Sequence, residues 1–200
     1  MSDRANSDSD CKSLAPIWES VAHDFAAEPS VVIAKVDAEA EQSKATAKEH
    51  GISSYPTIKF FPRGSSAAEP YEGGRSEKDV LDFLNDKTGT HRMVGGGLNA
   101  NAGTIAKLDS LLIDLAGNDI ERLSEKLKES SKDLKDKYAK YYVKVMDKWS
   151  SNKNYVTKEL ERVEGLIKKG GLAPEKLDDL TSRSNILRKF RGRDPEKQEL

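Results

Sequence analysis

The chain has 200 residues, of which 36% are hydrophobic and 34% are charged, and its formal net charge is −1. This length accommodates one modest domain or two small ones. The balanced charge argues against nucleic-acid binding, because neutralising phosphates requires a basic surface. No apolar run approaches the roughly 20 residues of a membrane-spanning helix, so membrane insertion is not expected.

The two ends of the chain carry different signals. Residues 1–10 are polar and lack the apolar centre of a signal peptide, so the chain as written has no secretory signal. Cys11 is the single cysteine and cannot form an intramolecular disulfide, so it gives no evidence of an oxidising compartment. The last four residues resemble the Lys-Asp-Glu-Leu retrieval signal of the endoplasmic reticulum: Lys197, Gln198, Glu199 and Leu200. A retrieval signal without an entry signal is a contradiction, which a missing natural N-terminus would resolve.

A helix and a strand are predicted first. The apolar residues of 11–25 recur at helical spacing, which predicts an amphipathic helix with a kink at Pro16. Residues 31–36 form a nearly continuous β-branched run between Pro29 and Asp37. We expect this run to be a strand buried on both faces, as in the middle of an α/β sheet.

Four further elements complete the first half. Residues 43–50 predict a short helix that ends at Gly51. Residues 57–61 predict a strand, and residues 71–73 predict a short third strand. Ser76 is the expected N-cap of a helix that follows. The resulting order is helix, strand, helix, strand, strand, helix.

The second half is expected to be entirely helical. Residues 89–103 are rich in glycine and asparagine and lose the apolar period, which predicts a flexible linker. Apolar residues at helical spacing then predict a short helix ending at Gly117 and a long helix from Ile120 to Trp149. A third helix should end at Gly170, and the last should begin near Pro174.

Several motifs, in one order and spacing, resemble the protein disulfide isomerases of the thioredoxin superfamily. The motifs are Cys11–Trp18, Ala34–Asp37, Ser53–Pro62 and Tyr71–Arg75. The helical half resembles the C-terminal domain of the PDI-Dβ type of endoplasmic-reticulum protein, through Asn152–Val156 and Leu187–Phe190. The resemblance implies a partial thioredoxin-like α/β domain followed by an all-α helical bundle.

The resemblance also implies that the thioredoxin-like domain is truncated. A whole thioredoxin fold has two strands before this helix, and residues 1–10 contain neither. The expected strand at 31–36 would then lack both neighbours, and each unpaired buried backbone group costs about 1–3 kcal/mol. We therefore expect an unstable N-terminal half and a helical half that folds alone. The expected divisions are a disordered start outside the family pattern at 1–10, a truncated thioredoxin-like domain at 11–88, a linker at 89–103, the helical domain at 104–192 and a tail at 193–200.

The family resemblance assigns roles to a small group of residues. In disulfide isomerases the first cysteine of a pair is the nucleophile and the second resolves the mixed disulfide. Cys11 matches the second, and Asp8 stands where the first would be. The Tyr55–Pro56 bond is implied to be cis and to dock substrate strands through their backbone. Arg75 matches the arginine that approaches the second cysteine.

Each of these residues also has a purely structural interpretation. Cys11 would then be a partly buried inert thiol, Pro56 would only shape a turn, and Arg75 would be an exposed arginine after two glycines. The three histidines are scattered and share no metal-ligand spacing with Cys11, so no metal site is expected. The resemblance implies no diffusible cofactor.

Three functions compete. The first is a protein disulfide isomerase family member that assists oxidative protein folding in the lumen of the endoplasmic reticulum, by thiol-disulfide exchange with unfolded or cysteine-containing secretory proteins. The missing nucleophilic cysteine argues against turnover by this chain. The second is a redox-inactive chaperone that binds clients, and the third is a non-functional fragment. A retrieval receptor would be the partner of the C-terminal tetrapeptide.

Overall fold

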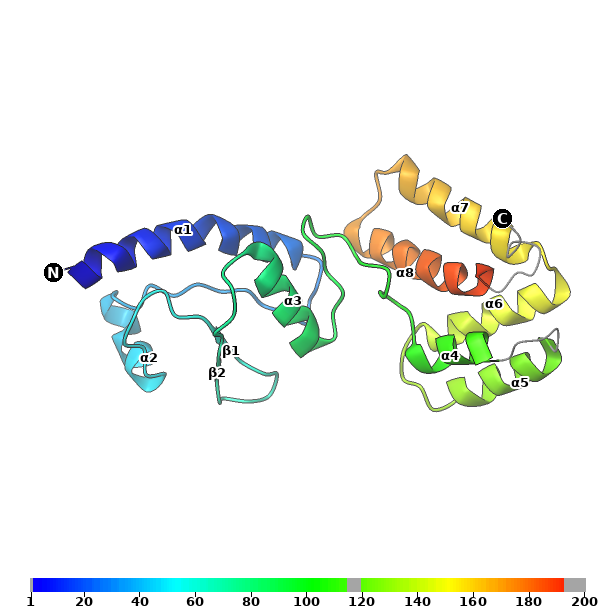
Figure 1. Ribbon diagram of the computed structural model, residues 1–200, viewed down its shortest axis with the longest axis horizontal. Coiled ribbons are helices and arrows are strands. Elements are labelled where there is room, and N and C mark those ends of the chain that lie inside the picture. Colours follow the sequence, from blue (N-terminus) through cyan, green and yellow to red (C-terminus); the bar gives the residue numbers. More distant parts are fainter. Residues whose placement is uncertain (1, 115–119, 193–200) are drawn as a thin grey trace. The chain divides into compact units, whose positions relative to one another are not determined.

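The computed structural model describes residues 2–114 and 120–192, and it divides into two compact units, residues 1–97 and 98–200. In the first unit a long helix, a short helical turn, a second helix, a two-stranded sheet and a third helix follow one another (Figure 1). Their bounds are α1 Ser2–Asp24, η1 Glu41–Ser43, α2 Lys44–Glu49, β1 Lys59–Phe60, β2 Glu69–Pro70 and α3 Glu77–Thr88.

Helix α1 is longer than predicted. The amphipathic pattern predicted residues 11–25, and residues 1–10 were expected to be disordered, but the helix begins at Ser2 and ends at Asp24. Pro16 lies inside it. Once the amphipathic part has nucleated a helix, each added residue gains a backbone hydrogen bond, so a polar segment of modest helix propensity can extend it.

The predicted strand at residues 31–36 is wrong. Residues 31–37 form no ladder in the described structure, whose sheet pairs only β1 with β2. Val32 is 85% exposed and Val36 is 65% exposed, so the segment is not buried on both faces either. A β-branched run becomes a strand only when a neighbouring strand supplies ladder hydrogen bonds, and no described segment pairs with residues 31–37 in this way.

The remaining elements of the first unit follow the predictions with shifted bounds. The predicted short helix is η1 followed by α2, and Gly51 adopts a positive φ of 62°. The strand predicted at 57–61 is reduced to β1, and the strand predicted at 71–73 lies slightly earlier, as β2. The side chain of Ser76 accepts a hydrogen bond from the Asp79 amide, forming the predicted cap of α3.

The core of the first unit is small. Helix α1 packs against α3, and the buried apolar side chains are Val21, Phe25, Val80, Leu81 and Leu84. Partly buried aromatic and aliphatic side chains surround them: Trp18, Val31, Ile33, Phe60, Tyr71 and Phe83. This core holds α1 and α3 together, and one face of α1 lines the site described below.

The second unit consists of helices in its described residues, α4 Ala106–Asp114, α5 Ile120–Ser131, α6 Ala139–Ser151, α7 Tyr155–Lys169 and α8 Pro174–Arg191. The single long helix predicted from Ile120 to Trp149 is wrong, because α5 and α6 are separate. A turn intervenes, in which the Asp136 side chain accepts a hydrogen bond from the Tyr138 amide at 2.7 Å. The last helix begins at Pro174 as predicted. Gly117 and the C-terminal tetrapeptide lie outside the described residues.

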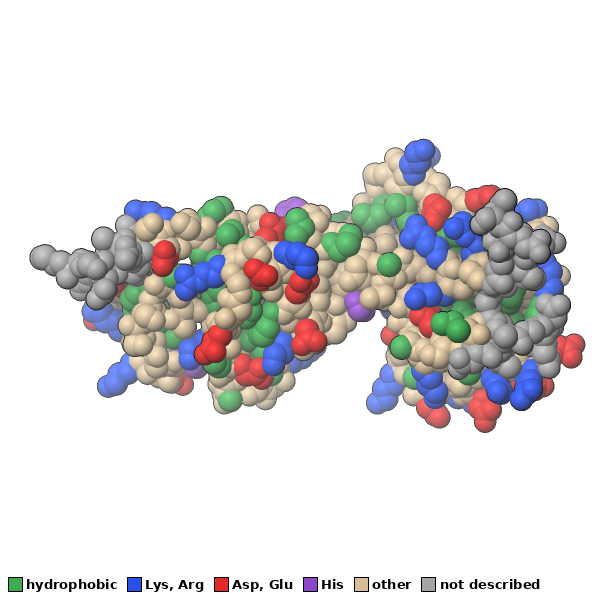
Figure 2. Space-filling view, in the orientation of Figure 1, with side chains coloured by type: hydrophobic (Ala, Val, Ile, Leu, Met, Phe, Trp, Pro, Cys, Tyr) green, Lys and Arg blue, Asp and Glu red, His purple; other side chains and the backbone are tan. Residues whose placement is uncertain are grey.

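The second unit has the larger core, in which Tyr142, Met146 and Phe190 are fully buried. The Tyr142 hydroxyl donates a hydrogen bond to Asp109 and accepts one from the Ile105 amide at 3.1 Å. Basic and acidic side chains are interspersed on the surface of this unit (Figure 2), in agreement with the net charge near zero.

Residues 89–103, the predicted linker, make specific contacts within both units. In the first unit the buried Arg92 donates hydrogen bonds to the Gly96 and Ala27 carbonyls, at 3.0 and 3.3 Å. In the second unit the side-chain amide of Asn185 donates to the Asn99 carbonyl at 2.9 Å. The division between the units falls between Gly97 and Leu98, inside this segment.

Candidate functional site

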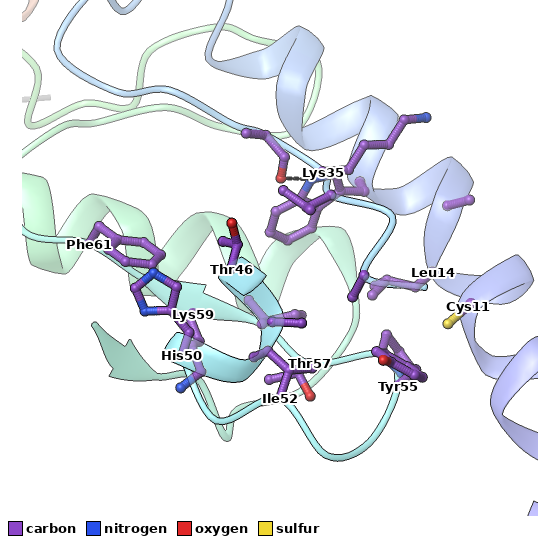
Figure 3. A pocket seen from close by; sticks show the side chains of 18 residues that line it. Cys11, Leu14, Lys35, Thr46, His50, Ile52, Tyr55, Thr57, Lys59 and Phe61 are labelled. Carbon is purple, nitrogen blue, oxygen red and sulfur yellow. Dashed lines mark hydrogen bonds between the residues drawn. The ribbon is translucent and has the colours of Figure 1, made fainter. Parts of the chain in front are cut away.

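Helix α1 places Cys11 beside a pocket. Cys11, Leu14 and Trp18 recur at spacings of three and four residues, so they share one face of the helix. Cys11 is half-buried, and its sulfur lies on the side of α1 that faces the pocket (Figure 3). The indole Nε1 of Trp18 donates a hydrogen bond to the Ala34 carbonyl at 3.1 Å. This bond attaches the segment that follows α1 to the helix.

We name this cavity of about 360 Å³ the Cys11 pocket. Three parts of the first unit line it, namely one face of α1, the segment around Lys35 and the segments around α2 and β1 (Figure 3). Most lining side chains are apolar, and no aspartate or glutamate is among them. The lining residues are Cys11, Leu14, Ala15, Trp18, Ala34, Lys35, Val36, Ala38, Thr46, Ala47, His50, Ile52, Tyr55, Pro56, Thr57, Ile58, Lys59 and Phe61.

The predicted Tyr55–Pro56 cis bond is confirmed, and both residues line the Cys11 pocket together with Cys11. Arg75 lies just outside the pocket and reaches this loop, since its Nη2 donates a hydrogen bond to the Pro56 carbonyl at 3.5 Å. Its Nη1 lies 3.8 Å from Oδ2 of Asp10, the residue before Cys11. The four predicted site residues are thus brought together, with Arg75 linked to the cysteine only through these neighbours.

The position of Cys11 within its helix affects its chemistry. Free backbone N–H groups at a helix N-terminus can stabilise an anionic sulfur. Helix α1 begins at Ser2, so Cys11 lies about two and a half turns inside the helix. The residue before Cys11, Asp10, contributes a carboxylate. Cys11 therefore lies beyond the first turn of α1, where such free N–H groups occur.

The sequence analysis assigned no site role to two residues that line the pocket, His50 and Trp18. The ring of His50 packs edge-to-face against Phe61, with centroids 5.2 Å apart, although the sequence suggested no role for this histidine. Trp18 was predicted only as an apolar residue of the helix. The spacing of seven residues between Cys11 and Trp18 could have indicated that Trp18 lies near the cysteine, because residues seven apart lie on one helix face.

The described residues contain neither a candidate metal-binding cluster nor a candidate membrane-spanning helix. No group of three or more histidine, cysteine, aspartate or glutamate side chains in residues 2–114 and 120–192 could hold a metal ion. Across the same part of the chain, none of the helices combines the length and apolar character that crossing a membrane would require.

Comparison with known proteins matches each unit to a family. Residues 5–86 match the family described as "Thioredoxin". Residues 103–190 match "Endoplasmic reticulum protein ERp29, C-terminal domain". The thioredoxin match begins at residue 5, so much of the segment 1–10, which we expected to lie outside the family pattern, falls inside it.

Relatives match both units together. The chain is 61% identical over 186 residues to "Protein disulfide-isomerase tigA" of Aspergillus niger, covering 93% of this chain and 51% of that protein. It is 53% identical over 185 residues to "Protein disulfide-isomerase erp38" of Neurospora crassa, and the match covers 90% of this chain and 50% of that protein. It is 40% identical over 184 residues to "Probable protein disulfide-isomerase A6" of Medicago sativa, and the match covers 88% of this chain and 50% of that protein. The chain spans about half the length of these relatives. Together with the two domain matches, they show that this chain belongs to the protein disulfide isomerase family.

Proposed function

We propose that this chain takes part in oxidative protein folding in the endoplasmic reticulum, by forming mixed disulfides between Cys11 and cysteine-containing secretory proteins. The observation that carries the proposal is the half-buried thiol of Cys11 beside a mostly apolar pocket, which Tyr55 and Pro56 also line. An apolar pocket next to a thiol favours unfolded polypeptides over small polar disulfides, because it can bury their apolar side chains.

The proposed exchange uses a single sulfur. The deprotonated Cys11 attacks one sulfur of a client disulfide, a new bond forms between Cys11 and that sulfur, and the other client sulfur leaves as a thiolate. The chain has no second cysteine to resolve this mixed disulfide. A thiol of the client or a small-molecule thiol would therefore have to attack it, regenerating Cys11.

Tyr55, Pro56 and Arg75 would position the client during this exchange. The peptide edge at Tyr55–Pro56 borders the pocket, so an extended client chain could form backbone hydrogen bonds there. Arg75 would hold the loop in place through the Pro56 carbonyl while remaining near the cysteine through Asp10. We assign Arg75 a positioning role.

Mixed-disulfide formation tests the proposal. The full chain would be incubated with an apolar peptide whose one cysteine carries a 2-thiopyridyl group, and the adduct would be measured by intact mass. We expect one adduct per chain and none for Cys11→Ser. A matched control, Cys11→Ser combined with Ser20→Cys, moves the thiol to another partly buried position of α1 that does not line the Cys11 pocket.

The control should react more slowly than wild type with the apolar peptide, and equally fast with a small polar disulfide. Equal rates with the apolar peptide for both thiols would contradict a role for the pocket. Absence of any adduct on Cys11 would contradict the thiol chemistry itself.

A second function, client binding without redox chemistry, is favoured by the single cysteine. In that case the chain would suppress aggregation of an unfolding protein equally well with Cys11→Ser. Under either function, Lys197, Gln198, Glu199 and Leu200 would serve as the signal read by a retrieval receptor.

A further inference from the structure

The segment that follows α1 leaves its backbone hydrogen-bonding groups unused. Among the described residues, none of the N–H groups of residues 32–37 donates a hydrogen bond to the protein. Of their carbonyl groups, only that of Ala34 accepts one, from Trp18. The trace of this segment runs back nearly straight alongside α1 (Figure 1), and Lys35 forms an ion pair with Glu19 of that helix at 3.6 Å. The segment therefore has the free donors and acceptors of an unpaired strand.

From Val31 to Ala34 partly buried and exposed side chains alternate, as they do in a strand with one buried face. Val31 and Ile33 pack against the core of the first unit, whereas Val32 and Val36 are exposed. An apolar side chain that is 85% exposed, as Val32 is, gains nothing from burial in this structure. Both the backbone and the outward side chains are thus available to a partner.

Strand β1 offers a second free edge on the other side of the Cys11 pocket. The Ile58 carbonyl accepts a hydrogen bond from the Tyr71 amide at 3.0 Å, on the side of β2. Because successive residues of a strand direct their backbone groups to opposite edges, Thr57 and Lys59 direct theirs away from β2. Figure 3 shows Lys35 and Thr57 on opposite sides of the pocket, which both residues line.

We propose that the Cys11 pocket binds an extended apolar peptide strand of another polypeptide, which pairs its backbone with residues 32–36 and with the free edge of β1. The mostly apolar lining selects apolar side chains. Lysine side chains, Lys35 and Lys59, carry the only fixed charges of the lining, so an acidic residue in the strand is favoured and a basic one is not.

This charge preference distinguishes the partner from a second copy of the chain. The exposed segment of a second copy would bring its own Lys35 toward the lysines of the pocket, which is unfavourable. The inference deepens the proposed function, because Cys11 lines the same pocket. It is tested with peptides that contain no cysteine, so the outcome does not depend on thiol chemistry.

The probe is a capped six-residue peptide of alternating valine and threonine with one terminal glutamate. In a Trp149→Phe chain, Trp18 is the remaining tryptophan, and it lines the pocket. We expect saturable quenching or enhancement of its fluorescence, together with slower hydrogen exchange at the amides of residues 32–36. A peptide methylated on alternate backbone nitrogens should bind at least about five-fold more weakly, since it loses ladder hydrogen bonds. The same peptide with lysine in place of glutamate should also bind more weakly.

Matched proline variants test the pairing from the side of the chain. Val36→Pro removes one free N–H and should raise the Kd at least about five-fold. Val94→Pro changes an equally exposed valine away from the Cys11 pocket, at the second position of a turn in which the Gly96 amide donates to the Met93 carbonyl. Proline is favoured at that turn position, so binding should not change.

Equal affinity for the methylated and unmethylated peptides would overturn the inference. Hydrogen exchange at residues 32–36 that does not change when peptide is added would also overturn the inference. Protection of these amides that rises with chain concentration in the absence of peptide would overturn it too, because a second copy of the chain would then be the occupant. Peptide binding that survives in Cys11→Ser supports the inference even if mixed-disulfide formation fails.

Discussion

Replacing Phe190 with alanine is expected to destabilise the helical unit by about 3–5 kcal/mol, the usual cost of removing a fully buried aromatic ring. Phe190 is 0% exposed, and its ring centroid lies 5.9 Å from that of Tyr142 and 6.1 Å from that of Trp149. Two helices meet at this ring, since Phe190 belongs to α8 while Tyr142 and Trp149 belong to α6. No neighbouring side chain can fill the space without breaking other contacts.

The measurement is urea unfolding followed by the fluorescence of Trp149 in a Trp18→Phe chain, which reports on the helical unit alone. Leu177→Ala on the same helix is the control, because Leu177 is 37% exposed, and its cost should stay below about 1 kcal/mol. If Phe190→Ala lowers the free energy of unfolding as little as the control does, the described core is contradicted.

Replacing Tyr142 with phenylalanine should cost about 1–3 kcal/mol, because the Ile105 amide loses its acceptor and Asp109 loses a donor. Burial raises the pKa of Tyr142 above its usual value, and the hydrogen bond to Asp109 raises that pKa further. The unfolded chain ionises its tyrosines near pH 10. The contribution of Tyr142 is therefore complete below about pH 10 and is lost as the pH rises from there toward the raised pKa.

Tyr141→Phe is the control that separates the stability effect of the lost hydrogen bonds from the stability effect of tyrosine ionisation. Burial also raises the pKa of Tyr141, but its buried hydroxyl has no hydrogen-bond partner among the described residues. Both variants should lose stability less steeply than wild type above pH 10, whereas Tyr142→Phe should be much less stable than Tyr141→Phe at pH 7. Equal stability of the two variants at pH 7, measured by urea unfolding, would contradict the role of the Tyr142 network.

Local features of the sequence predicted the local structure well. Helical spacing predicted most helices of the second unit, Ser76 was recognised as a cap, and Pro174 as a helix start. The separation of α5 from α6 was missed because Asp136 acts there through a side-chain hydrogen bond to the backbone, which apolar periodicity does not detect.

Features that depend on distant partners could not be predicted in this way. The β-branched residues 31–36 have strong strand propensity, yet pairing is decided by whether another segment lies alongside. The family resemblance predicted that neighbours would be missing, and it also predicted the cis bond before Pro56. It did not predict that Trp18 would bond to Ala34, or that the pocket would extend from Cys11 to Phe61.

We infer that Cys11 can form a mixed disulfide but cannot complete a redox cycle without an external thiol, because the chain has one cysteine. Incubation of the pre-reduced chain with insulin, in the absence of any small-molecule thiol, tests this inference by intact mass. We predict that wild type stays attached to insulin as a mixed disulfide and that Cys11→Ser forms no adduct. Asp8→Cys, which restores a second thiol at the family position, should release reduced insulin while its two cysteines form a disulfide. Release of reduced insulin by wild type under these conditions would contradict the inference.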